Sequence, residues 1–383
     1  YSTKSAAWEN MEDRVIIAGG VKEGQQRGGA GTLFVKDKEL DESHLYVKGI
    51  TGNDAKTGAD LTGVIGVIYD VSHANLEVQG DVNQTINLDD AQLHINGNLQ
   101  SSTIQLNNAV LTVGGDVLTS SVNLVGATFN VGGNIASEDI ISQSSQISFG
   151  GEWTVDNINV ALTDSTLTVS TADSENTFDT VSLVNSLVTS TEVSSIDDIG
   201  INWTLSVLSI DLNSSIDVSG KGWAYNEGPS ERPSTRAGGT YGGQGAGEST
   251  IEPYGSVVEP NDFGSAGYNN TGLGGGVIHI TAGTLSLNGT IKATGADALN
   301  YGGGSGGSIW LDVTDLTSDT GSDIELNSIV ATGGNGGSQS NGNGGGGGRV
   351  AIYYSTKRAA WDDMEGRVTI AGGVKEGQQR GGA

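Results

Sequence analysis

The sequence predicts an all-β chain folded as a parallel β-solenoid, in which short strands stack in register from one rung of the coil to the next. Three observations predict it: an apolar repeat of about 18 residues, a second repeat with an offset of 353 residues, and an acidic, glycine-rich composition. The inward positions are unevenly spaced within each short repeat, which favours a right-handed β-helix with three unequal faces over a triangular left-handed coil. Rungs of about 18–20 residues are expected, with one inserted loop rich in glycine, proline and aromatic residues.

The composition excludes several classes of function. The 383 residues contain 45 Asp and Glu against 18 Lys and Arg, a net charge of −27. No nucleic-acid partner is expected, because binding to phosphates needs clustered cations. The absence of cysteine excludes disulfides, thiolate metal sites and cysteine nucleophiles. No apolar run is long enough for a membrane-spanning segment, so none is expected.

Residues 1–56 are interpreted as the start of a repeat, with its joint and entry rungs. Tyr1–Ala30 and Tyr354–Ala383 are identical at 25 of 30 positions. Such identity at a constant offset indicates one 353-residue period followed by the start of the next, so 354–383 is assigned to the next tandem repeat. The alternative is two copies of a local motif that cap one domain. Cations and tryptophans of these segments are the candidate residues of the repeat joint: Trp8, Arg14, Arg27, Trp361, Arg367 and Arg380.

Residues 57–220 are predicted to form the regular, acidic part of the solenoid. One apolar position recurs every 17 or 18 residues, and a second apolar position lies two residues after it in each repeat. The first position is occupied by Leu76, Leu93, Leu111, Phe129 and Ile147. Apolar pairs at i and i+2 indicate strands with one buried face, and recurring Gly, Asn and Asp indicate corners at fixed places. Between Lys56 and Lys221 there are 20 acidic residues and no Lys or Arg, and this self-repulsion favours an elongated shape.

Residues 221–272 interrupt both repeats. All four prolines of the chain lie there, with a group of aromatic residues: Trp223, Tyr225, Tyr241, Tyr254, Phe263 and Tyr268. About fifty residues without a strand or helix period indicate a loop insertion. Three interpretations stay open for its aromatic residues: burial against the solenoid by a loop folded back on it, contact with another protomer, or binding of a glycan.

Residues 273–353 are predicted to resume the solenoid in a glycine-rich form. Residues 221–383 contain 40 of the 62 glycines, yet apolar alternation persists at 277–280, 285–287 and 309–311. The glycine blocks, such as 302–304 and 344–348, are interpreted as corners where backbones approach closely or adopt positive φ. Collagen is excluded because glycine does not occupy every third position and proline is scarce.

Residues with catalytic or metal-binding chemistry are few. The densest acidic cluster could hold calcium through carboxylate oxygens, although it lacks the EF-hand spacing: Asp312, Asp315, Asp319 and Asp323. The acidic doublets 89–90 and 197–198 point to opposite faces if they lie on strands, so neither is an obvious acid–base pair. We expect no enzyme activity and no cofactor, with calcium the one ion considered. A polysaccharide-cleaving enzyme is retained as the third alternative.

The glycine-rich phrases resemble those of a known group of proteins. GGAGTLFVK (28–36), GGGSGGSIWLDV (302–313) and GGGGGRVAIYY (344–354) are similar to repeats of very large bacterial surface proteins, which are β-helical, adhesin-like or fibre-forming. The resemblance implies an extracellular protein at the cell surface. The matching end segments predict copies of the chain itself as partners, joined covalently in tandem or head to tail. A glycan or cell-surface partner is the expectation of the alternative, adhesin-like function.

These observations predict a structural protein whose stacked units continue end to end into a fibre or long surface stalk. Matching ends allow each open strand edge to continue into the next unit instead of being blocked. With roughly 14–18 rungs at about 4.8 Å each, one period is expected to advance by roughly 70–85 Å. The alternative function is an adhesin module in which the 221–272 loop binds a glycan or a surface protein.

Overall fold

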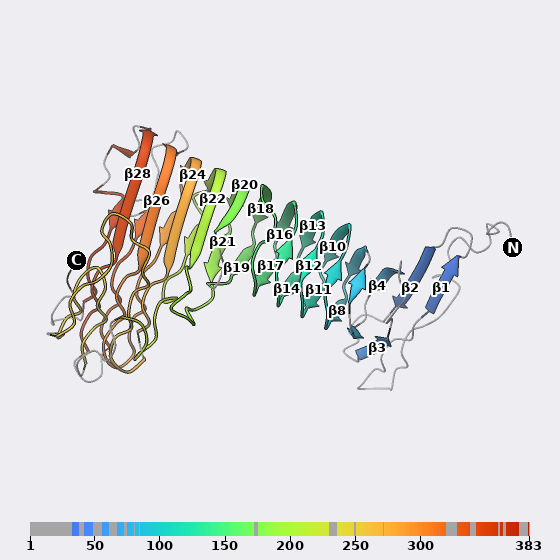
Figure 1. The fold of residues 1–383 in the computed structure, drawn as a ribbon, viewed down its shortest axis with the longest axis horizontal. Helices are drawn as coiled ribbons and strands as arrows, with labels where there is room; N and C mark the ends of the chain where they lie inside the picture. The colour runs from blue at the N-terminus through green and yellow to red at the C-terminus, as the bar shows by residue number, and fades with distance from the viewer. Residues whose placement is uncertain are drawn as a thin grey trace. The chain divides into compact units, whose positions relative to one another are not determined.

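The computed structural model describes residues 85–171, 175–229, 236–248, 250–270, 272–318, 328–337 and 342–358, with short pieces at 81–83, 361–362, 365–374 and 382. Before residue 81 it describes the strands alone. These residues form an all-β structure with long parallel sheets and almost no helix beyond short pieces such as the three-residue 3-10 turn at Tyr268–Asn270 (Figure 1). The chain divides into two compact units, residues 1–155 and 156–383. The arrangement within each unit is consistent with a β-solenoid.

Three parallel sheets build the first unit. In hydrogen-bonded order, the strands of the first sheet are β2 (Glu42–Lys48), β4 (Val67–Ser72), β7 (Ile86–Asp89), β10 (Thr103–Asn107), β13 (Ser121–Val125) and β16 (Asp139–Gln143), with β1 (Leu33–Asp37) antiparallel on β2. Those of the second are β3 (Lys56–Asp60), β5 (Asn75–Gln79), β8 (Gln92–Ile95), β11 (Val110–Val113), β14 (Thr128–Val131) and β17 (Gln146–Phe149). The third contains β6 (Val82–Asn83), β9 (Leu99–Gln100), β12 (Val117–Leu118) and β15 (Ile135–Ala136).

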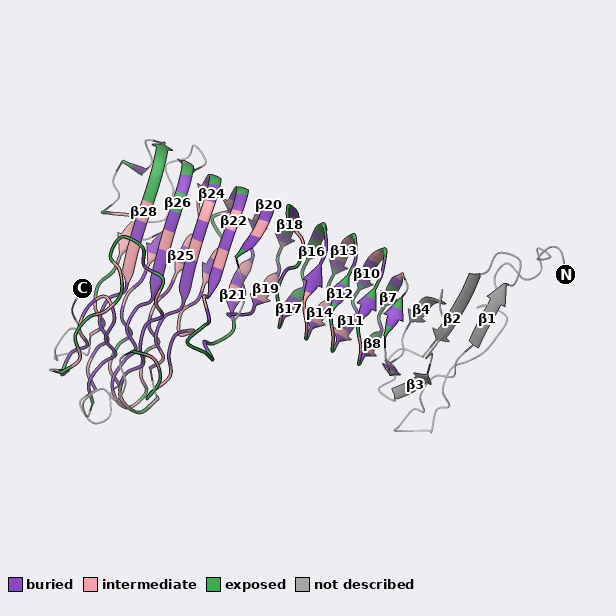
Figure 2. Cartoon of the chain, viewed as in Figure 1, coloured by how far each residue is buried: buried purple, intermediate pink, exposed green. Residues whose placement is uncertain are grey.

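The predicted short repeat is confirmed in this unit. Leu93 pairs with Leu111 and Leu111 with Phe129, so each rung takes up one copy of the short repeat. Burial alternates along the strands as the i and i+2 pairs require (Figure 2). The inward side chains are almost fully buried and form one apolar stack that ends on edge-to-face contacts of Phe149 with Phe129 and Trp153.

Two columns of residues explain the polar corners of the first unit. Left-handed backbone recurs at the equivalent position of successive rungs, at Asp90, Asn108, Gly126 and Ser144, with φ between 46° and 60°, and Asp, Asn and Gly adopt this conformation most readily. At another corner, the Asp or Asn side-chain oxygen of one rung accepts a hydrogen bond from the backbone N–H of the equivalent residue in the next. For example, the Asp116 N–H donates to Asn98 Oδ1 at 2.8 Å.

Two parallel sheets build the second unit, with longer strands. One contains, in order, β18 (Ile158–Thr163), β20 (Asn176–Val184), β22 (Ile201–Ile210), β24 (Val277–Leu287), β26 (Ser308–Thr317) and β28 (Arg349–Lys357). The other contains β19 (Thr166–Val169), β21 (Leu187–Ser190), β23 (Ser215–Asp217), β25 (Thr290–Lys292), β27 (Ile329–Val330) and β29 (Val368–Thr369).

The rung length expected from the short repeat is wrong for the second unit, where the rungs are longer. Paired residues are 21 apart between β18 and β20 (Val160 with Val181), 31 apart between β24 and β26 (Ile278 with Ile309), and 41 apart between β26 and β28 (Ile309 with Val350). The strands of the first sheet lengthen to 9–11 residues from β20 onward. From β23 onward the rungs also grow because a glycine-rich segment lies between each short strand and the next long strand.

These glycine-rich segments are not corners. The backbone N–H groups of residues 303–307 donate to carbonyl oxygens of three neighbouring segments. Gly303 and Gly306 donate to residues 343 and 346, and Gly304 and Gly307 donate to residues 296 and 293. Ser305, between them, donates to Ser265. The direction of hydrogen bonding therefore repeats every three residues, which is the period of a polyproline II helix. Each segment bonds to three neighbours, and the buried backbone groups are satisfied without forming a sheet.

Close backbone contact is what requires glycine in this bundle. A Cβ on Gly304 would lie 1.8 Å from the carbonyl oxygen of Leu273, and one on Gly345 would lie 2.0 Å from that of Gly304. Neither glycine has the positive φ of a left-handed turn. Of the two roles predicted for the glycine blocks, close approach is therefore the one that operates at these positions, and it operates along whole segments.

Candidate functional site

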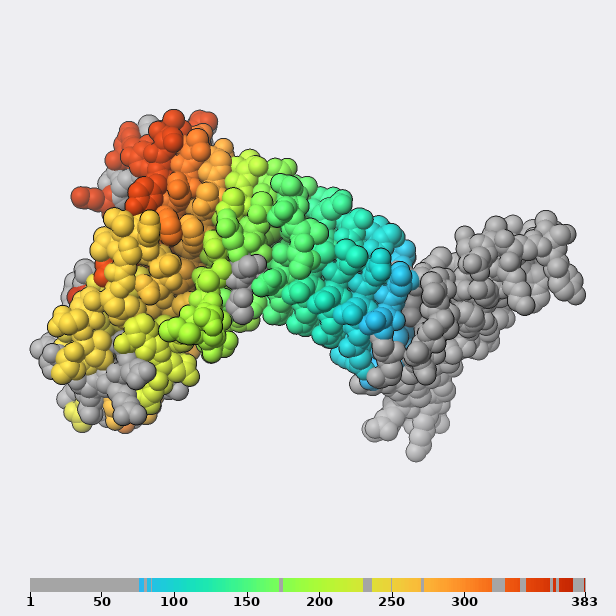
Figure 3. Space-filling view, viewed as in Figure 1, coloured from blue at the N-terminus to red at the C-terminus, as the bar shows by residue number. Residues whose placement is uncertain are grey.

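The insertion 221–272 packs against the second unit. Trp223 and Phe263 are buried, contact each other edge to face at a ring-centroid distance of 6.0 Å, and form an apolar cluster with Val193 and Val277. Their backbones continue the glycine bundle, since the Trp223 N–H donates to Gly264 O. Figure 3 shows the insertion, in yellow, lying against the orange and red residues of the same unit. The apolar cluster therefore attaches the insertion to the rest of the second unit through Val193 and Val277.

A second cluster connects the insertion to the long strands through polar groups. Tyr241 is fully buried, and its hydroxyl lies 2.7 Å from Ser308 Oγ, which itself donates to Asp262 O at 2.6 Å. Arg349, on β28, donates from Nε and Nη2 to the Tyr254 carbonyl oxygen at 3.0 and 2.8 Å. The same guanidinium lies 5.5 Å from the centre of the Tyr241 ring, a cation–π distance.

The environment of this cluster keeps its phenols neutral. Burial raises the pKa of Tyr241 to about 12, and burial also raises the pKa of Tyr254 well above its ordinary value. Burial raises the pKa of Asp262, although the nearby Arg349 charge lowers it in part. The Tyr254 hydroxyl donates to Phe263 O at 2.8 Å. Both phenols therefore serve as hydrogen-bonding groups inside the fold at neutral pH.

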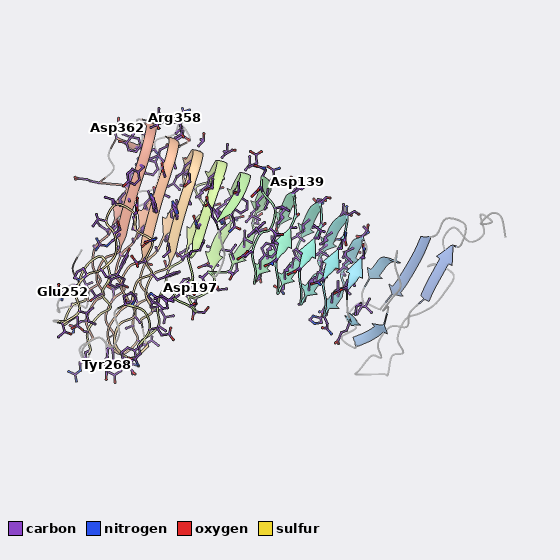
Figure 4. All side chains as sticks on the ribbon, viewed as in Figure 1. Asp139, Asp197, Glu252, Tyr268, Arg358 and Asp362 are labelled. Atoms are coloured by element: carbon purple, nitrogen blue, oxygen red, sulfur yellow. The ribbon has the colours of Figure 1, made fainter. Side chains whose placement is uncertain are left out.

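Two aromatic residues of the insertion are placed differently. Tyr225 and Tyr268 are half-buried, with ring centroids 5.5 Å apart, and Tyr268 lies 5.3 Å from the ring of Tyr301 (Figure 4, where Tyr268 is labelled). Of the six aromatic residues singled out as candidates for burial, protomer contact or glycan binding, Trp223, Tyr241 and Phe263 are thus inside the unit, and Tyr254 is partly covered there. Tyr225 and Tyr268 present part of their surface to solvent.

The predicted repeat joint is described on its C-terminal side. Trp361 is fully buried, and its Nε1–H donates to the Thr317 carbonyl oxygen at the end of β26 (3.3 Å). The guanidinium of Arg367 lies 5.7 Å from the Trp361 ring centre. Lys357 and Asp362 form an ion pair next to this tryptophan, near the end of β28 where Figure 4 labels Arg358 and Asp362. Trp8, Arg14, Arg27 and Arg380 lie outside the described residues.

The backbone of the second copy continues the rungs before it. Residues 354–357 form the second half of β28 and pair in parallel register with β26, Tyr354 opposite Val313 and Lys357 opposite Leu316. After Trp361 the chain forms β29 on β27, and the Gly333 and Gly336 N–H groups donate to carbonyl oxygens of 371 and 374. Gly373 then donates to Gly345 O, inside the glycine bundle.

The acidic cluster on β26 is only partly described. Asp312 is exposed, while Asp315 accepts a hydrogen bond from Thr356 Oγ1 at 2.7 Å. Asp319 and Asp323 lie outside the described residues. Among the residues that the structure describes, no group of three or more His, Asp or Glu side chains is placed to hold a metal ion.

The sequence reasoning missed a stacked ring pair on the outer face of the long strands. His279 and Trp310 pair across β24 and β26, with ring centroids 3.9 Å apart and an angle of 10° between planes. Burial lowers the pKa of His279, whereas the Glu175 and Asp312 charges raise it in part. His279 does alternate with buried Ile278 and Ile280 as expected. Its partner could have been found only from the register of the long rungs, which the short repeat does not predict.

No protein-family model, curated protein or solved structure matches the chain. Searched over its described residues, the structure contains no helix with the length and apolar character needed to cross a membrane.

Proposed function

We propose that the chain is a structural repeat of a right-handed β-helix, and that successive repeats stack end to end into an extracellular fibre or surface stalk. The observation that carries the proposal is the position of the second repeat copy. Its described residues add to both sheets of the second unit in parallel register, as the next rung of the same coil. The resemblance of the glycine-rich phrases to bacterial surface proteins supports the extracellular location.

The open strand edges support end-to-end growth. Among the described strands, β28 and β29 end their sheets, and both carry residues of the second copy. Unpaired strand edges associate readily with further strands, and natural proteins usually block them. Here the residues that follow in sequence begin a new repeat, so the next unit covers the edge. Backbone hydrogen bonds and apolar stacks then provide most of the cohesion, since exposed ion pairs contribute only about 0–1 kcal/mol each.

The rung count changes the expected length of one period. The first unit contributes six parallel strands to its long sheet and the second unit six, counting β28 once per period. If all twelve stack along one fibre axis at about 4.8 Å each, a period advances by about 58 Å. This value replaces the roughly 70–85 Å predicted from short rungs alone, because long rungs use more residues for each step.

A covalent chain of four full periods tests the proposal. Electron microscopy of the purified chain should show rods with an axial repeat of about 58 Å, the spacing expected for twelve stacked rungs. Rod length should increase in proportion to the number of periods, and chains of two and three periods serve as matched controls. Separate, freely jointed particles, or an axial repeat independent of period number, would show that the repeats do not stack and would end the fibre proposal.

A second function, glycan binding, is favoured by one observation: Tyr225, Tyr268 and Tyr301 form a half-buried series of rings in edge-to-face contact. Aromatic rings of this kind stack on sugars. Tyr268→Ala should abolish binding to a glycan array if this site is used, whereas Tyr353→Ala, on another exposed tyrosine, should not. Equal binding by both variants, or none by the parent chain, argues against an adhesin.

A further inference from the structure

We propose that the site filled by the described residues of the second repeat copy also accepts the N-terminal segment, residues 1–30, of a second molecule, so that chains can join head to tail without a covalent link. The inference rests on the proposed stacking of repeats. It adds a partner and a site: a second molecule of this chain, bound through its N-terminal segment on the edge formed by β26, β27 and the glycine bundle.

The residues that anchor the internal segment are the same in both copies. Trp361, Arg367 and Lys357 correspond to Trp8, Arg14 and Lys4. The Trp361 side chain is the largest in the segment and is fully buried, with its indole N–H donated to Thr317 O and a cation over its ring. Burial of a tryptophan with its polar group satisfied is typical of the residues that dominate binding energy at interfaces.

The five differences between the copies leave the described contacts available. At 358, where the first copy has Ser5, the contact is made by the backbone: the Arg358 N–H donates to Leu316 O at 3.0 Å. At 369, where the first copy has Ile16, the Thr369 carbonyl accepts from the Ala331 N–H at 2.8 Å. At 362 the first copy has Glu9, which keeps a carboxylate for the lysine that matches Lys357.

Most of the remaining contacts are independent of side chains and follow the strand-addition mode of peptide recognition. Residues Tyr354–Lys357 of the segment pair with β26, and its strand β29 pairs with β27. The segment then contributes backbone groups to the glycine bundle. A segment of one molecule placed on the opposite end of another is a heterologous contact. Such contacts build open filaments when they do not close into a ring.

Competition by the internal segment limits this exchange in the intact chain. Residues 354–383 follow β26 on the same polypeptide and begin within β28. Their effective concentration at the site is therefore in the millimolar range, as for a short connection. A second molecule at micromolar concentration competes poorly with it. Weakening the internal copy alone should therefore release the site to the N-terminal segment of another molecule.

The repeat provides its own matched variants for the test. We compare the full chain, Trp361→Ala, Trp8→Ala and the double variant by analytical ultracentrifugation between 1 and 200 μM. Trp361→Ala should form oligomers whose mass rises with concentration, whereas Trp8→Ala and the double variant should sediment as the parent chain does. A Trp361→Ala chain that stays monomeric at every concentration overturns the inference. So does a double variant that associates as strongly as the single one, because the association would then come from exposed apolar surface.

A binding measurement gives a second readout. A fluorescent peptide of residues 1–30 should bind the Trp361→Ala chain at least tenfold more tightly than the same peptide carrying Trp8→Ala, as followed by anisotropy. Equal binding of the two peptides rejects the site. If Trp361→Ala loses its β-sheet circular dichroism, the series is repeated with Arg367→Ala, which removes the cation over the Trp361 ring, and with Arg14→Ala at the matching position of the first copy. Stacking of the covalent four-period chain together with a monomeric Trp361→Ala chain would reject joining between molecules and leave the fibre proposal standing.

Discussion

Glycine in the second unit removes side-chain volume from between neighbouring backbones. At Gly304 and Gly345 the nearest atoms to an added Cβ are carbonyl oxygens of Leu273 and Gly304, at 1.8 and 2.0 Å. Backbone cannot turn aside as a flexible side chain can, so the whole segment would have to shift. In the first unit, by contrast, Gly126 has a φ of 60°. It belongs to the column of left-handed residues that also contains Asp90, Asn108 and Ser144. The same residue type thus serves two physical needs in one chain.

Gly345→Ala should lower the free energy of unfolding by about 3 kcal/mol, at the upper end of the usual cost of overpacking. Urea denaturation followed by tryptophan fluorescence measures the change. Leu299→Ala is the control, because Leu299 is 81% exposed and its truncation should change stability by less than about 0.5 kcal/mol. Equal effects of the two substitutions would contradict the close packing of the glycine bundle.

Tyr241 should make the stability of the second unit sensitive to alkaline pH. Its folded pKa of about 12 lies above the ordinary value of 10.0, so the folded state binds the phenolic proton more tightly than the unfolded state does. The stabilisation is fully present below pH 10 and is lost as the pH rises from 10 through 12. For a shift of this size it is on the order of 2–3 kcal/mol.

Tyr241→Phe should remove this part of the alkaline loss. At pH 8 the variant loses the hydrogen bond to Ser308 and should be less stable by about 1 kcal/mol. Between pH 10 and 12 its stability should fall less steeply than that of the parent chain; Tyr254, whose pKa is also raised, accounts for part of what remains. Parallel pH profiles of the two proteins, measured by chemical denaturation, would show that the buried phenol is not responsible.

The rungs of the first unit are held in register by a column of side chains at one corner. Asp81, Asn98, Asp116 and Asn134 each accept a hydrogen bond from the backbone N–H of the next rung, at 2.7–2.8 Å. The paired glycines beside the column make room for it, since a Cβ on Gly133 would lie 2.3 Å from Asp116 Oδ1. The Gly-Asn and Gly-Asp corners of the sequence therefore link successive rungs by hydrogen bonds.

Asp116→Ala should destabilise the first unit by about 1 kcal/mol, because the Asn134 N–H loses its acceptor. Asp116→Asn keeps an acceptor oxygen and reproduces the residue found one rung earlier and one rung later, so its stability should stay close to that of the parent chain. Thermal unfolding of both variants measures the difference. A loss as large for Asn as for Ala would assign the effect to the charge rather than to the ladder.

Strand positions in the first unit were predictable because they depend on local alternation. Leu93, Leu111 and Phe129 stack as their spacing indicates, and each strand buries the residues that the i and i+2 rule selects. Rung length in the second unit was not predictable, because segments such as 293–298 and 302–307 contain few side chains that could show a period. Their partners, including residue 346 for Gly306, are set by contacts distant in sequence.

The candidate site was predictable in composition but not in arrangement. The sequence singled out Trp361 and Arg367 as joint residues, and the structure brings them together. It also singled out the aromatic residues of the insertion, yet Tyr241 and Trp223 are buried while Tyr225 and Tyr268 are half-exposed. No local pattern distinguishes these pairs. The difference depends on which residues face Ser308, Val277 and the glycine bundle after folding.

At the scale of the whole molecule, a net charge of −27 opposes any compact arrangement of the chain. The cation-free segment 57–220 contains 20 acidic residues, so neighbouring rungs carry like charges without nearby lysine or arginine in sequence. Electrostatic repulsion of this kind is screened by salt, with a Debye length of about 8 Å at 0.15 M. Cations in solution should therefore stabilise the fold without binding at any single site.

Raising NaCl from 10 mM to 500 mM should raise the melting temperature by on the order of 5 °C, through screening of this repulsion. CaCl₂ at the same ionic strength should have a similar effect, measured by differential scanning calorimetry. A further rise of several degrees produced by 0.1 mM CaCl₂ but not by 0.1 mM MgCl₂ would instead indicate a specific calcium site, for which Asp312 and Asp315 would be the first residues to replace.

The sequence by itself determined four features: the near-identity of the two end segments, the short rungs of the first unit, the acidic composition and the candidate residues of the joint. Each of these is visible either in residues close together in the chain or in the comparison of the two copies. Only the tertiary structure decided that the glycine-rich segments form a hydrogen-bonded bundle with a three-residue period, that the insertion packs against this bundle, and that the later rungs lengthen. Because glycine has no side chain, a glycine-rich segment shows no pattern of apolar and polar residues from which its neighbours could be predicted. Its partners are chosen by backbone hydrogen bonds and close contact, and these exist only once distant segments have come together.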